Sequence, residues 1–157
     1  MNSTTGAPSA EHAIATASRN FSIGFTGMIG FEFLEWEEGR VVLGLDIQAR
    51  HLNLHGVIHG GVLATLLDVA GACPGTFCPY PGRVRKALTL SMTTTFTGQA
   101  GKGRIRAIGT KRAGGSRIYN SSVDIVDADG RLLAFGEGTF RLRSGCEAPY
   151  GIAMEAE

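Results

Sequence analysis

One acidic side chain lies within a segment that is otherwise almost entirely apolar. Residues 62–72 read VLATLLDVAGA, and Thr65 and Asp68 are their only polar side chains. A helix that is apolar on every side is a buried helix. A buried carboxylate costs several kcal/mol unless it is paired, hydrogen-bonded or protonated. Asp68 is therefore the first candidate for a catalytic nucleophile or general base.

The same segment begins directly after His59, Gly60 and Gly61. The first backbone N–H groups of a helix have no partner within the helix, and they carry the positive end of its dipole. Because glycine has no side chain, another group can approach these donors. Such a helix end can hold an anion or a developing oxyanion. We take the Gly60 amide as a candidate oxyanion donor. The alternative is that the two glycines only permit a sharp turn or close packing.

The spacing of these two groups predicts an oligomer. At 1.5 Å per residue, Asp68 lies about 12 Å along the helix axis from Gly60, so one copy of the helix cannot bring both groups to one reacting atom. Two antiparallel copies can, because the acid of each then faces the glycine end of the other. This arrangement requires at least a two-fold dimer with paired sites across its interface. The alternative is a structural acid that hydrogen-bonds a backbone group or a hydroxyl at a subunit contact.

The string NLHGVIHGG over residues 53–61, followed by Asp68, resembles the hotdog-fold acyl-CoA thioesterases. The resemblance is to the phenylacetyl-CoA thioesterase (PaaI-like) type within the 4-hydroxybenzoyl-CoA thioesterase superfamily, and it covers about residues 29–142. It implies an α+β hotdog fold, in which a long central helix is wrapped by an antiparallel sheet of about six strands. It also implies that two chains join their sheets edge to edge. The implied reaction is hydrolysis of an acyl-CoA to the free acid and CoA.

The resemblance also implies roles for five residues. Asp68 would be the nucleophile or general base, and the Gly60 amide would stabilise the oxyanion. Asn53 would hold the substrate carbonyl or a catalytic water, and His59 would orient the loop or the thioester. Thr89 stands where relatives often carry a Ser or Thr that positions the attacking water.

Each of the supporting residues also has a structural interpretation. Asn53 can be a turn residue, His59 can cap the helix or bond a carbonyl, and Thr89 can be a β-branched strand residue. Gly61 and Thr65, which belong to the same helix, are assigned to substrate binding. The sequence does not decide between these interpretations.

Alternating segments on both sides of the helix agree with the hotdog order. A hairpin is expected over residues 29–36 and 41–47, and a loop over residues 48–58 leads to the helix. Four more strands are expected over residues 87–96, 103–110, 118–126 and 132–142. Two strands, one buried helix and four strands give an antiparallel sheet folded around a helix.

The chain divides into three expected parts. Residues 1–20 are a mobile N-terminus and a short helix over residues 11–20, capped by Ser9. Residues 21–143 form the hotdog thioesterase domain, and residues 144–157 form an irregular tail. Prolines and glycines between residues 74 and 82 exclude further regular structure until about Lys86.

Composition is that of one ordinary soluble domain of 157 residues, with 43% hydrophobic and 18% charged residues. The low charge suits a protein that hides surface in a homo-oligomer, either a dimer or a homotetramer. The net charge of +1 gives no support for a nucleic-acid partner. No apolar run approaches the roughly 18 residues that span a bilayer, and no basic start precedes an apolar core. We expect a cytoplasmic protein without a membrane partner.

Three histidines, His51, His55 and His59, recur every four residues, as on a metal-binding helix face. However, Gly56 and the two β-branched residues that follow it make this segment a poor helix. The three cysteines, at positions 73, 78 and 146, have no close C-x-x-C spacing, so neither structural zinc nor a disulfide framework is expected. We expect no metal and no other cofactor, and we interpret Cys73 as a small apolar core residue.

Basic residues that could contact CoA phosphates stand in two groups: Arg83, Arg85 and Lys86, or Lys111, Arg112 and Arg117. Ordinary solvation of turns explains them as well. Two other functions are weighed against a thioesterase. A hotdog dehydratase or hydratase uses a different pattern of His and acid, which is not found here, whereas a dimer that binds acyl thioesters or another apolar ligand without turnover fits the same residues.

Overall fold

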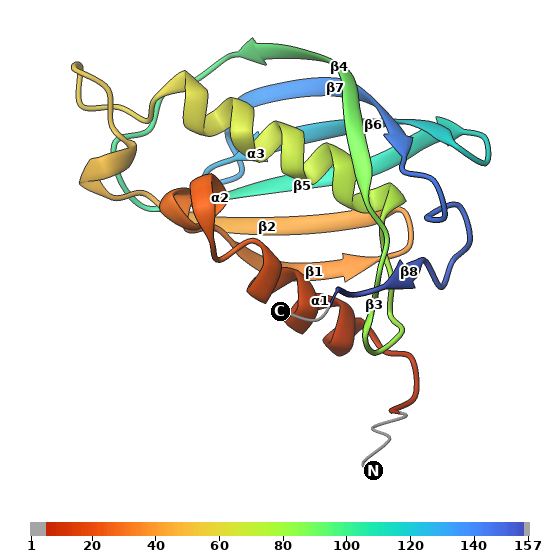
Figure 1. Ribbon diagram of the computed structural model, residues 1–157. Coiled ribbons are helices and arrows are strands. Elements are labelled where there is room, and N and C mark those ends of the chain that lie inside the picture. The colour runs from red at the N-terminus through yellow and green to blue at the C-terminus, as the bar shows by residue number, and fades with distance from the viewer. Residues whose placement is uncertain (1–5, 156–157) are drawn as a thin grey trace.

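The protein is described by a computed structural model that covers residues 6–155. The parts of the predicted mobile N-terminus and irregular tail that fall on residues 1–5 and 156–157 lie outside the described residues. A six-stranded antiparallel sheet curves around helix α3 (Gly60–Ala72), as Figure 1 shows. The strands, in spatial order, are β1 (Glu32–Glu37), β2 (Arg40–Asp46), β5 (Arg104–Gly114), β6 (Ile118–Val126), β7 (Leu132–Leu142) and β4 (Ala87–Phe96). The predicted α+β hotdog architecture is confirmed.

The central helix begins at Gly60, as predicted, and it packs on the sheet at very short range. An ideal Cβ built on Gly109 of β5 would lie 1.8 Å from the Ala70 carbonyl oxygen of α3. A side chain at position 109 is therefore incompatible with this helix position, and glycine allows the two backbones to meet. The main core lies between the sheet and the apolar side of the helix.

The prediction that α3 is buried on every side needs correction. Gly61 is exposed, and Ala64, Thr65, Asp68 and Ala72 are half-buried in the single chain. These residues follow one another at helical spacing, so they form one stripe along the helix. The stripe lies toward β4, which is the edge strand of the sheet and covers the helix only in part.

The N-terminal region contains one predicted helix and one that was not predicted. Helix α1 (Ala10–Asn20) is capped by the Ser9 side chain, which accepts a hydrogen bond from the His12 N–H group. Helix α2 (Gly24–Ile29) reads GFTGMI, and its two glycines make it a poor helix by local propensity. Its last residue, Ile29, is buried, and the Ile29 carbonyl accepts a hydrogen bond from a ring nitrogen of His51. Tertiary contacts therefore hold a helix that the local sequence disfavours.

The segment after α3 and the C-terminal region pair with each other, which corrects two further expectations. A short turn η2 (Cys73–Gly75) follows α3, and strand β3 (Arg83–Val84) pairs with β8 (Ile152–Ala153). The Arg83 Nε and Nη2 groups donate to the carbonyls of Tyr150 and Gly151 at 2.6 and 2.8 Å. In the described part of the chain, no helix has both the length and the apolar character needed to cross a membrane.

Candidate active site

Asp68 of α3 and Thr89 of β4 are in direct contact. The Thr89 hydroxyl donates to Asp68 Oδ1 at 2.7 Å. Hydrogen bonds to a carboxylate are short and stronger than neutral ones, so this contact fixes the orientation of the acid. Among residues 6–155, no hydrogen-bond partner is found for Oδ2, which is therefore available to a water molecule or a substrate.

The N-terminus of α3 is arranged around His59. Its Nδ1 accepts a hydrogen bond from the Gly61 N–H at 2.8 Å, and its carbonyl accepts from the N–H groups of Val62 and Leu63. Because Nδ1 is an acceptor, the proton of the neutral ring is on Nε2. Of the first four N–H groups of the helix, only that of Gly60 lacks an acceptor within the described residues. The Gly60 amide is therefore an unfilled donor at the positive end of the helix.

Among residues 6–155, no contact requires glycine at position 60. An ideal Cβ there would lie 3.5 Å from the Phe96 ring, which is an ordinary contact, and the Gly60 backbone is not left-handed. Position 61 differs, because a Cβ there would lie 3.0 Å from His59 Nδ1 and would crowd the cap. The packing of the described residues therefore does not explain glycine at position 60.

Asn53 organises the loop that leads to α3. Its Oδ1 accepts hydrogen bonds from the N–H groups of His55 and Val57 at 2.8 and 3.4 Å, and its own N–H donates to the Val57 carbonyl. Asn53 Oδ1 therefore has the role expected of a turn residue. The side-chain nitrogen Nδ2 of Asn53 has no hydrogen-bond partner among the described residues. Thr65 donates to the Gly61 carbonyl at 2.8 Å, so the hydroxyl that we assigned to substrate binding is engaged within the helix.

The candidate residues of the single chain therefore form two separate sets, called here the candidate half-sites. Asp68 and Thr89 are one set, and His59 and Gly60 with Asn53 of the preceding loop are the other, with about two turns of helix between Gly60 and Asp68. The structure brings each set together but does not bring the two sets together within one chain.

Strand β4 offers a surface for a second copy. It is the edge of the sheet, and its side chains Leu90 and Phe96 are 49% and 51% exposed. A ten-residue edge strand with exposed apolar side chains is a template for pairing with another chain. The same strand carries Thr89, which contacts Asp68.

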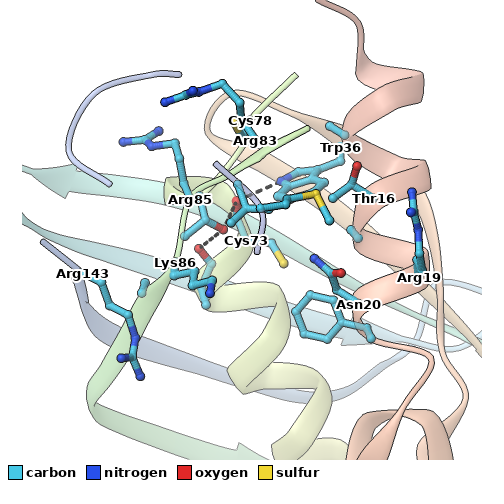
Figure 2. Close-up of a pocket in the computed structure, with 18 of the residues that line it drawn as sticks. Thr16, Arg19, Asn20, Trp36, Cys73, Cys78, Arg83, Arg85, Lys86 and Arg143 are labelled. Carbon is cyan, nitrogen blue, oxygen red and sulfur yellow. Dashed lines mark hydrogen bonds between the residues drawn. The ribbon is translucent and has the colours of Figure 1, made fainter. Parts of the chain in front are cut away.

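A cavity of about 780 Å³ lies at the C-terminal end of α3, under α1 and beside β3. Figure 2 shows Trp36 and Cys73 in the wall of this cavity, where the Trp36 Nε1 group donates to the Cys73 carbonyl at 2.9 Å. Sequence reasoning did not find this cavity, because its walls come from α1, β1, the end of α3, β3 and the C-terminal region. No local pattern signals such a convergence.

The histidines serve separate structural roles. His51 is buried, and its ring accepts from the Gln48 N–H at 3.0 Å and donates to the Ile29 carbonyl at 2.8 Å. His59 caps α3, and His55 is exposed in the loop. Within residues 6–155, no group of three or more His, Cys, Asp or Glu side chains is arranged to hold a metal ion.

Cys73 is the cysteine nearest to Asp68 in sequence. Burial, with a smaller contribution from the Asp68 charge, raises the pKa of the Cys73 thiol far above its ordinary value. The thiolate is the reactive form, so the thiol is inert near neutral pH. We expect iodoacetamide at pH 8 to leave Cys73 unmodified in the folded protein and to alkylate it after denaturation. Peptide mass spectrometry measures this, and rapid alkylation of the folded protein would contradict it.

Comparison with known proteins identifies the family that this chain resembles. No family model matches the chain. A solved structure of a thioesterase-superfamily protein is 29% identical, with a TM-score of 0.72, over 83% of this chain and 98% of that one. A mutant of the phenylacetic acid degradation protein PaaI from Thermus thermophilus is 29% identical, with a TM-score of 0.64, over 74% and 96%. A thioesterase from Haemophilus influenzae, at 20% identity and a TM-score of 0.74 over 83% and 90%, shows the same fold.

The chain is thus similar to hotdog-fold proteins of the thioesterase superfamily, and its structural neighbours include PaaI. These neighbours support a thioesterase-like, hydrolytic function.

Proposed function

We propose that the protein is an acyl-CoA thioesterase that hydrolyses its substrate to a free acid and CoA at a site shared by two subunits. One observation carries the proposal. Asp68, fixed by Thr89, lies in one half of α3, and the unfilled Gly60 amide lies at the other end of the same helix. Neither half-site completes a reaction centre within one chain.

In the proposed dimer, the β4 strands of two subunits pair at the sheet edge. Antiparallel pairing about a two-fold axis would cover Leu90 and Phe96 and would set the two α3 helices in opposite directions. The Asp68 of each chain would then face the Gly60 amide of the other. The interface is isologous, so a dimer has two equal sites.

The chemistry follows from these groups. In the general-base route, Asp68 takes a proton from water while the water oxygen attacks the thioester carbonyl carbon. The Gly60 amide of the second subunit stabilises the oxyanion, and the His59 Nε2–H is a further donor nearby. The C–S bond then breaks, and the CoA thiolate leaves and takes up a proton. If Asp68 attacks directly instead, an anhydride forms and water hydrolyses it to the same products.

The proposed location is the cytoplasm. The three cysteines of the chain are buried and free, which suits a reducing compartment.

A thiol-release assay tests the proposal. Acetyl-, hexanoyl-, phenylacetyl- and palmitoyl-CoA are mixed with the protein, and the CoA thiol is detected with a disulfide reagent. We expect release with a kcat in the usual enzyme range of about 1–10³ s⁻¹ for at least one substrate. The competing function is that of a hotdog dimer that binds acyl thioesters without turnover. Tight binding of acyl-CoA without thiol release would support that function and overturn ours.

A further inference from the structure

The cavity under α1 is lined by residues of α3 and β4 that stand close to Asp68 and Thr89 in the sequence. Ala72 follows Asp68 by one helical turn, about 6 Å along α3, and Ala87 precedes Thr89 by two residues on β4. Both alanines line the cavity. The wall of the cavity therefore comes within one helical turn of the acid and within two strand positions of its hydrogen-bond partner.

The inner wall of the cavity is apolar. Trp36 is 9% exposed, and its only polar group is already bonded to the Cys73 carbonyl. Phe21 and Ala17 of the α1 region complete this wall. A volume of about 780 Å³ lies within the range of about 300–1,000 Å³ that is typical of small-molecule pockets. The wall therefore suits the hydrocarbon part of an acyl group.

The rim of the cavity is basic. Arg83 and Arg85 are engaged, since both donate to carbonyls of the C-terminal segment. In contrast, the Arg19 and Lys86 side chains, which Figure 2 shows on different elements around the cavity, have no hydrogen bond or ion pair with any described residue. The one carboxylate among the described lining residues is that of Glu155.

We propose that this cavity holds the acyl group and that Arg19 and Lys86 select acyl groups with a carboxylate at the end remote from the thioester. This inference rests on the proposed thioesterase function. The apolar wall receives the methylene chain, and the two cations bind the terminal anion by charge-assisted hydrogen bonds. An anion at this rim could also come from the phosphates of CoA, and the experiment separates the two sources.

The first test compares adipyl-CoA with hexanoyl-CoA, which has the same chain length but no terminal carboxylate. In the double variant Arg19→Gln and Lys86→Gln, we expect kcat/KM for adipyl-CoA to fall by about 10- to 100-fold, as for lost hydrogen bonds to a charged group. The value for hexanoyl-CoA should change by less than about two-fold. The control variant, Lys102→Gln with Arg106→Gln, removes the same charge from exposed positions outside the cavity and should leave both values unchanged.

Equal losses for both substrates would show that Arg19 and Lys86 bind CoA phosphates, and this would overturn the proposal. Unchanged values for both substrates would overturn it as well.

The second test does not depend on turnover. Trp36 is the only tryptophan of the chain and it lines the cavity, so its fluorescence reports occupancy. In the Asp68→Asn protein, we expect adipyl-CoA to change this fluorescence at about 10-fold lower concentration than hexanoyl-CoA, and the preference should vanish in the Gln variants. If the wild type releases thiol but shows no preference, the proposed function stands and this inference fails. If it releases none but the preference is present, the proposed function fails and the cavity assignment stands.

Discussion

Replacing Asp68 with Asn should lower kcat for every acyl-CoA substrate by about 10²- to 10⁴-fold, the usual contribution of a positioned general base. The amide keeps the size of the side chain, and its oxygen can still accept the Thr89 hydrogen bond. It can neither take a proton from water nor attack as a nucleophile. The effect should therefore appear in kcat measured by thiol release, with the fold and the assembly unchanged.

The matched control is Asp124→Asn. Asp124 is exposed on β6, and its side chain makes no hydrogen bond or ion pair with another described residue. We expect wild-type kcat for this variant. Circular dichroism and size-exclusion chromatography compare the two variants with the wild type. An Asp68→Asn protein that keeps more than about a third of the wild-type kcat would remove Asp68 from the mechanism.

Replacing Gly60 with Pro should lower kcat by about 10²- to 10³-fold, as for the loss of one oxyanion donor. Proline has no N–H group, yet it is well tolerated at the first position of a helix. The preceding residue, His59, has φ −67° and ψ 137°, which is the extended conformation that proline requires before it. The variant therefore removes the donor while the helix is expected to form. Gly60→Ala is the control, because it retains the N–H group and its Cβ meets only the Phe96 ring at 3.5 Å.

Mixing the two inactive variants tests whether the site is shared. In a dimer of one Asp68→Asn chain and one Gly60→Pro chain, one site combines the intact Asp68 with the intact Gly60. Random pairing of equal amounts gives half mixed dimers, each with one good site of two, so about a quarter of the wild-type activity should return. The chains are refolded together, and thiol release is compared with that of each variant refolded alone. Absence of recovery would show that Asp68 and Gly60 do not act at one site across the interface.

Much of the fold was predictable because its signals are local. The strands β4 (Ala87–Phe96) and β7 (Leu132–Leu142) have the predicted bounds, since alternation and turn residues mark both ends. Helix α3 starts where the glycine pair follows His59. By contrast, α2 and the β3–β8 pair depend on contacts between distant parts of the chain, such as the Arg83 hydrogen bonds to the C-terminal backbone.

The candidate site was predictable only as a set of residues. The pattern that carries the family resemblance indicated Asp68 and Thr89. In the structure, Thr89 Oγ1 lies 2.7 Å from Asp68 Oδ1. The prediction that Asp68 is fully buried was wrong for the single chain, in which it is half-buried. A helix pattern cannot show that the neighbouring strand, β4, lies at an edge of the sheet. The cap formed by His59 and the cavity beside Trp36 depend on side-chain directions and on distant segments, which spacing alone does not contain.

The contact between Gly109 and the Ala70 carbonyl has a consequence for how this protein can change. The height of α3 above the sheet is set by main-chain atoms, which side-chain substitutions elsewhere leave in place. The cavity wall, in contrast, consists of side chains from several independent elements. If the cavity holds the acyl group as proposed, substitutions in α1 or β3 would change the substrate range while this backbone contact keeps α3 and Asp68 in place, so evolution or engineering would not need to rebuild the scaffold.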